Sequence, residues 1–115
     1  MHVGWLLYGN SDVRIEFDDR VLAHLQVVVG SKLRRNESFF LCWRDSRAAG
    51  DGQSCIWMSR RIPMYFKYET PERMSLNSAW LRELDLSASS RTGLFVTAEP
   101  GSEVLPRPES SVRSS

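Results

Sequence analysis

Aromatic and basic residues gather in the middle of the chain, where they offer a way to bind nucleic acid. Two apolar runs, Ser38–Trp43 and Cys55–Met58, flank a polar loop that contains Gly50–Gly52. Aromatic rings stack on unpaired bases, and cations bind phosphates. The pattern predicts a nucleic-acid-binding surface with Trp43 or Trp57 as the stacking residue. The cations expected to hold phosphates are Lys32, Arg34, Arg35, Arg60 and Arg61.

A purely structural role explains the same residues. Cations near the end of a helix complement its dipole, and aromatic strand residues usually form the core. Alternation places Phe39 and Trp43 on one face of the first strand and Phe40 on the other. We expect most of these rings to be core residues, so the exposure of Trp43 and Trp57 decides between the two alternatives.

Length and charge limit the functions that are open to the chain. It has 115 residues, enough for one domain with one core, and 42% of them are hydrophobic. The formal net charge is only +1, but residues 32–68 hold eight basic and three acidic side chains, a local charge of +5. A polyanion would therefore be bound through the centre of the chain rather than through its total charge.

The sequence predicts no catalytic or metal site. Asp18 and Asp19 stand where a helix begins and are expected to cap it. His24 has no Cys or His neighbour at zinc spacing, and no nucleophile has a recognisable partner. Cys42 and Cys55 both lie in apolar runs and are expected to be reduced core residues. We therefore expect no cofactor.

The amino-terminal segment has no cationic leader, and its apolar run is too short for a signal or a membrane span. The sequence thus predicts a cytoplasmic protein that does not enter a membrane. It leaves the oligomeric state open.

Hydrophobic periodicity divides the chain into alternating strands and helices. The first helix is expected after Asp18 or Asp19, with an apolar stripe that reaches Leu33 unless Gly30 ends it. Asn77 is expected to cap the second helix. The strands are expected at residues 5–8, 13–17, 38–44, 54–58, 64–68 and 94–96.

These elements predict an α+β fold with a mostly antiparallel sheet, two helices and the order β-β-α-β-β-β-α-β. We expect residues 1–97 to form one domain. Residues 98–115 are rich in Pro, Ser, Glu and Arg and are expected to be a disordered tail.

Most of the chain resembles a family of short actinobacterial proteins, a domain of unknown function whose members are commonly labelled "ATP-dependent DNA ligase". The resemblance spans nearly all of residues 4–97. The segments that carry it are Tyr8–Gly9, Ile15–Arg20, Leu22–Gln26, Lys32–Arg35, Ser38–Phe40, Trp43, Gly50–Gly52 and Ile56–Trp57.

The resemblance implies an association with DNA or with a DNA-processing enzyme. Ligases of that class attach AMP to the lysine of a Lys-x-Asp-Gly motif, and neither Lys32 nor Lys67 stands in one. We therefore expect a small non-catalytic module that binds nucleic acid or assists a DNA ligase or repair enzyme. The alternatives are a protein-interaction or self-assembling domain and, less favoured, ligase activity itself.

Overall fold

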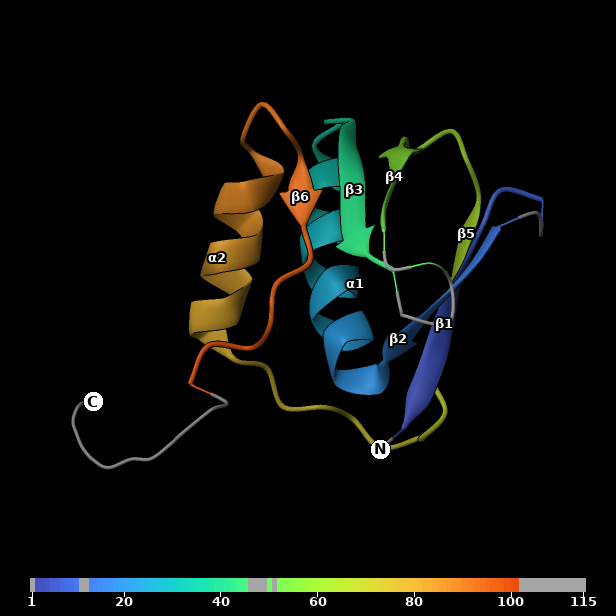
Figure 1. The fold of residues 1–115 in the computed structure, drawn as a ribbon, viewed down its shortest axis with the longest axis vertical. Coiled ribbons are helices and arrows are strands. Elements are labelled where there is room, and N and C mark those ends of the chain that lie inside the picture. The colour runs from blue at the N-terminus through green and yellow to red at the C-terminus, as the bar shows by residue number, and fades with distance from the viewer. Residues whose placement is uncertain (1, 11–12, 46–49, 51, 102–115) are drawn as a thin grey trace.

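The computed structural model describes residues 2–10, 13–45, 50 and 52–101. These residues form six strands and two helices in the predicted order (Figure 1). The elements are β1 (Val3–Tyr8), β2 (Val13–Asp18), α1 (Asp19–Arg34), β3 (Phe39–Arg44), β4 (Gln53–Met58), β5 (Met64–Lys67), α2 (Ser78–Ala88) and β6 (Leu94–Phe95). The α+β class and the element order are confirmed.

The strands fall into two three-stranded sheets, a division that the sequence prediction did not make. The first sheet has the order β2-β1-β5 and is antiparallel throughout. The second has the order β4-β3-β6, in which β3 and β4 form an antiparallel hairpin and β6 runs parallel to β3. β4 and β6 are therefore the edge strands of the second sheet.

Helix α1 begins and ends with local hydrogen bonds that the sequence supplies. The Asp18 carboxylate accepts from the backbone N–H of Arg20 and caps the first turn. At the other end the helix passes through Gly30 and stops where Asn36 has a φ of 58°. The backbone N–H of Glu37 then donates to the carbonyl of Lys32, which closes a Schellman turn.

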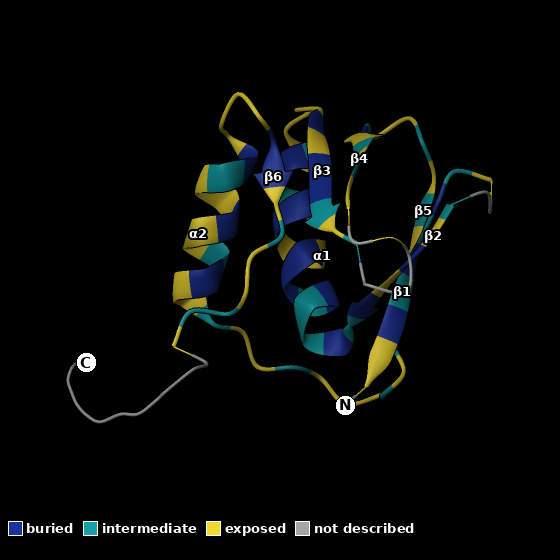
Figure 2. Cartoon of the chain, in the orientation of Figure 1, coloured by how far each residue is buried: buried dark blue, intermediate teal, exposed yellow. Residues whose placement is uncertain are grey.

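Helix α2 begins as predicted, because the Asn77 side chain accepts from the backbone N–H groups of Ala79 and Trp80. α1 packs on β1 and β2 of the first sheet and on α2, while α2 packs on β6 and β3 of the second. Buried residues face one another across these elements, and the outer side of α2 is exposed (Figure 2). The two sheets are joined through the packing of α1 on α2.

The segment after β6 returns to the start of α1. Glu99 forms an ion pair with Arg20 at 2.7 Å and accepts a hydrogen bond from the Asn77 amide at 2.8 Å. Contacts with the start of α1 therefore reach Glu99, and the domain end at residue 97 stays a prediction. Residues 102–115 lie outside the described residues, so disorder there stays a prediction.

Candidate functional site

Three exposed aromatic side chains share the outer face of the second sheet. Phe40 and Trp57 are paired across β3 and β4, and their ring centroids lie 5.0 Å apart with the planes at 69°. Phe95 on β6 is the strand partner of Cys42, which is two residues along β3 from Phe40. The exposed fractions are 46% for Phe40, 49% for Trp57 and 37% for Phe95. We call these three residues the aromatic face.

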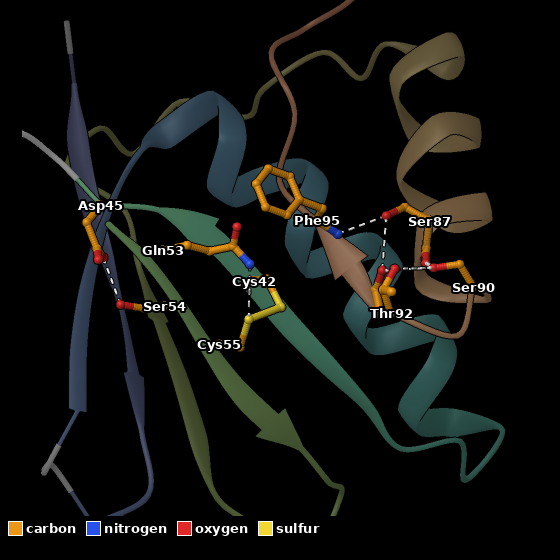
Figure 3. Close-up of a disulfide and its surroundings, with 10 residues drawn as sticks. Cys42, Asp45, Gln53, Ser54, Cys55, Ser87, Ser90, Thr92 and Phe95 are labelled. Carbon is orange, nitrogen blue, oxygen red and sulfur yellow. Dashed lines mark hydrogen bonds between the residues drawn. A yellow bond between two sulfur atoms is a disulfide. The ribbon is translucent and has the colours of Figure 1, made fainter. Parts of the chain in front are cut away.

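Contacts from outside the sheet hold this face in place. The Tyr8 hydroxyl on β1 donates to the carbonyl oxygen of Trp57. The Ser87 hydroxyl on α2 accepts from the backbone N–H of Phe95 at 2.8 Å (Figure 3). Gly93 has a φ of +93°, and a Cβ there would lie 2.5 Å from the Phe40 carbonyl oxygen. Only glycine fits this approach, which brings β6 against β3.

Two of the predicted phosphate-binding cations lie beside the aromatic face. Lys32 and Arg35, at the end of α1, line an open cleft of about 630 Å³ that Phe40 and Trp57 also line. Arg91, which the sequence analysis did not single out, lines it as well. We call this space the cationic cleft. It combines exposed rings with three basic side chains, the two chemical elements that base stacking and phosphate binding require.

Glu37 moderates the charge of the cationic cleft. Its carboxylate lies 2.9 Å from Lys32 Nζ and 3.3 Å from the Arg35 guanidinium. Hydrogen bonds from Lys32 and then Arg35 lower the pKa of Glu37 below its usual value, so the carboxylate stays charged. Lys32 is only 6% exposed and also contacts the Ser89 hydroxyl at 3.3 Å, which leaves Arg35 as the more accessible of the two cations.

The other predicted cations do not line this cleft. Arg34 lines a different groove of about 1000 Å³ between α1 and the β5 region, together with Tyr65. Arg60 and Arg61 are exposed in the turn between β4 and β5. That turn and the carboxyl end of α1 lie toward the same end of the molecule (Figure 1). Four of the five predicted phosphate-binding cations therefore lie toward one end of the molecule, whereas Arg34 lines a different groove.

Trp43 and Trp57 lie on opposite faces of the second sheet. Trp43 is half-buried against the core, and its ring meets Phe17 edge-on at a centroid distance of 6.0 Å. Trp57 faces outward beside Phe40. The two tryptophans therefore do not form one stacking surface. The aromatic residue beside Trp57 is Phe40 and not Trp43. The reason is register, because Trp57 pairs with Phe40 and Trp43 pairs with Ser54.

The expectation that both cysteines are reduced is wrong. Cys42 and Cys55 are direct partners in the β3–β4 ladder and form a disulfide on the outer face, beside Phe95 (Figure 3). Cys42 is buried and Cys55 is exposed. The apolar setting of the two residues suggested separate core positions, whereas the hairpin register brings them together.

The titratable residues near the start of α1 have structural partners. Asp19 is fully buried and accepts from the backbone N–H groups of Glu69 and Thr70 at 3.1 and 2.9 Å. His24 is also fully buried; Nε2 accepts from the backbone N–H of Asn77 at 2.8 Å, and Nδ1 lies 2.7 Å from the carbonyl oxygen of Arg20. Both ring nitrogens are thus occupied in the neutral tautomer.

Within the part of the chain that the structure describes, no group of three His, Cys, Asp or Glu side chains could hold a metal ion. Neither described helix has the length and apolar character that a membrane span needs. Asp51 of the predicted Gly50–Gly52 loop lies outside the described residues.

Fold and site together define a small α+β module with an exposed aromatic face beside a cationic cleft. The chain belongs to a family described as a domain of unknown function (DUF7882), which matches residues 3–99. Comparison with curated proteins and with solved structures gives no match.

Proposed function

We propose that this chain is a non-catalytic module that binds single-stranded nucleic acid across the aromatic face and the cationic cleft. The observation that supports this most strongly is the position of Phe40 and Trp57, which are both exposed and line the same cleft as Lys32 and Arg35. Stacking on each ring accounts for about 1–3 kcal/mol per base in proteins of this kind. Because the two ring planes are inclined at 69°, two successive bases would be splayed apart when each stacks on one ring.

Single strands fit this surface better than duplex. The bases of a duplex are stacked on one another, so their faces are closed to Phe40 and Trp57. A single strand exposes those faces, and its phosphates then reach the cations of the cleft. Arg35 and Arg91 are exposed cations that line the cleft, and the β4–β5 turn that holds Arg60 and Arg61 lies toward the same end of the molecule as the end of α1.

The resemblance to proteins labelled as ligases suggests which enzymes this module would work with. The module would act in the cytoplasm as an accessory to a DNA ligase or repair enzyme and would hold a strand rather than join it. Self-adenylation is disfavoured, because Lys32 Nζ is engaged by Glu37 and Ser89. Incubation with radiolabelled ATP would leave a covalent adenylate on the protein if the ligase alternative were correct.

A salt titration tests the proposal. Fluorescence-labelled single-stranded and duplex DNA of equal length are titrated with the full chain at 50 and 200 mM salt. About three phosphate contacts predict that affinity for the single strand falls roughly 20-fold across this range. The duplex should bind more weakly at both concentrations. Absence of binding, or binding without salt dependence, contradicts the proposal.

A protein-interaction module is the second candidate, and the same face motivates it. Three exposed aromatic side chains next to the edge strand β4 form the kind of apolar surface that partners or second copies cover. Light scattering separates this candidate from the first. A concentration-dependent dimer that Trp57→Ala disrupts, in a protein that does not bind DNA, would favour self-assembly.

A further inference from the structure

The Cys42–Cys55 disulfide joins two residues that the fold already holds together. The β3–β4 ladder pairs six residues of each strand, and the cysteines are opposite each other within it, with Cα atoms 4.1 Å apart. Only twelve residues separate them along the hairpin. The disulfide therefore brings no distant segment of the chain into place, which is the usual role of a structural cross-link.

The two residues of the disulfide differ in their exposure to solvent. Cys55 is exposed on β4, an edge strand that pairs with β3 alone among the residues that the structure describes. Cys42 is 5% exposed and lies on the central strand between β4 and β6. An incoming thiolate can thus reach Sγ of Cys55, and the electron pair of the broken bond then moves to Sγ of Cys42.

The surroundings of Cys55 suit exchange with another protein. The Gln53 side-chain amide donates to Sγ of Cys55 at 3.7 Å (Figure 3). This contact stabilises the thiolate that Cys55 becomes when the partner's second thiol resolves a mixed disulfide. The rings of the aromatic face lie on the same side of the sheet as the disulfide: the Phe40–Trp57 pair is two rungs along the ladder, and Phe95 is the β6 partner of Cys42. An exposed apolar surface around a reachable sulfur is a docking surface for the protein that carries the attacking thiol.

We propose that Cys42–Cys55 is a redox-active disulfide that exchanges with a protein dithiol. A thiolate of the dithiol attacks Sγ of Cys55, the Cys42–Cys55 bond breaks, and Cys42 takes up a proton. The second thiol of the partner then attacks the mixed disulfide, so the partner is oxidised to a disulfide and this chain is left with two thiols. Two electrons and two protons pass from the dithiol to the chain. This proposal does not depend on nucleic-acid binding.

Reduction of the folded protein is the first test. The oxidised full chain is incubated with reduced and oxidised glutathione at roughly 100:1, its free thiols are alkylated, and its mass is measured. Structural disulfides resist this buffer, whereas exchanging ones do not. We expect most molecules to gain two alkyl groups and to regain the disulfide when the ratio is reversed. A disulfide that opens only in denaturant, or cysteines that never pair in air, would overturn the proposal.

A matched pair of variants tests the direction of attack. Cys42→Ser leaves the exposed thiol of Cys55, and Cys55→Ser leaves the buried thiol of Cys42. Both variants are first shown to be folded by circular dichroism and are then mixed with oxidised glutathione. Because exposure governs thiol reactivity, we expect Cys55 to form the mixed disulfide at least about tenfold faster than Cys42. Equal or reversed rates would overturn the assignment of Cys55 as the attacked sulfur.

Discussion

Both ends of helix α1 carry charged side chains, but these side chains differ in their partners and in their exposure to solvent. At the amino end, Asp19, Arg20 and His24 are bonded to segments from far along the chain, including Glu99 79 residues away from Arg20. At the carboxyl end, the buried Lys32 contacts Ser89 as well as Glu37, whereas the exposed Arg35 contacts the nearby Ser31 and Glu37 and lines a cleft that is open to solvent. Polar groups that are satisfied by distant segments stabilise the fold, whereas groups beside an open cleft remain able to meet a ligand.

The largest effect is expected from removing Asp19, because it is fully buried and accepts two backbone hydrogen bonds. Asp19→Ala removes the acceptor of two part-buried backbone N–H groups, at about 1–3 kcal/mol each. We expect urea unfolding to show a loss of about 4 kcal/mol. Asp85→Ala, at an exposed position on α2, is the control and should change stability by less than about 0.5 kcal/mol. Equal effects of the two substitutions would contradict a structural role for the amino end.

Gly93→Ala is expected to cause the next largest loss of stability. It would also disturb the aromatic face, because Gly93 packs against Phe40. The positive φ and the approach to Phe40 both oppose a side chain, so we expect a loss of about 2–3 kcal/mol. Gly9→Ala is the control, since Gly9 also has a positive φ but a Cβ there would meet no atom within 4 Å. Both variants are compared by urea unfolding. A cost at Gly93 no greater than that at Gly9 would show that β6 does not depend on this contact.

Acid should weaken the amino end of α1 through Glu99. The bond to Arg20 lowers the pKa of Glu99 from 4.5 to about 2, so the unfolded chain binds this proton more readily than the folded one. The stability it contributes is complete above pH 4.5 and is lost as the pH falls toward 2. Because the Glu99 side chain is 20% exposed, solvent screening limits this contribution to about 1 kcal/mol.

Urea unfolding between pH 6 and 2 measures this loss, and Glu99→Gln is the matched variant. The wild type should lose about 1 kcal/mol more than the variant over that range. Parallel pH profiles of the two proteins would show that the Arg20–Glu99 pair contributes nothing to folding.

The smallest effect is expected at the rim of the cationic cleft. Arg91→Ala removes one exposed cation from the lining, and loss of one phosphate contact should weaken single-strand binding about threefold and reduce the salt slope by about 0.7. Arg82→Ala, at an exposed position on α2 outside the cleft, is the control. A change in affinity with an unchanged salt slope would mean that Arg91 does not meet a phosphate.

The sequence predicted the elements well because their signals are local. Apolar spacing identified both helices, and Asn77 was recognised as a cap from its position before an apolar run. Alternation also separated Phe40 from Phe39 and Trp43 correctly. Each of these features depends on residues within a few positions of one another.

The site was harder to predict because it depends on register and on turn geometry. The Phe40–Trp57 pair and the disulfide both follow from the pairing of β3 with β4. Counting outward from the expected loop, residues 45–53, pairs Cys42 with Ile56, one residue away from its true partner Cys55, so spacing alone does not fix the register. The Schellman turn brings Glu37 back to Lys32, which a count of charges along the chain cannot detect.

The most direct measurement follows the four tryptophan indole N–H signals by nuclear magnetic resonance while single-stranded DNA is added. We expect the signal of Trp57, which is 49% exposed, to shift with increasing DNA. The signals of Trp80, buried against His24, and of Trp43, packed on Phe17, should stay nearly unchanged. Trp57→Phe identifies the shifted signal. A Trp57 signal that does not move at saturating DNA would contradict binding through the aromatic face.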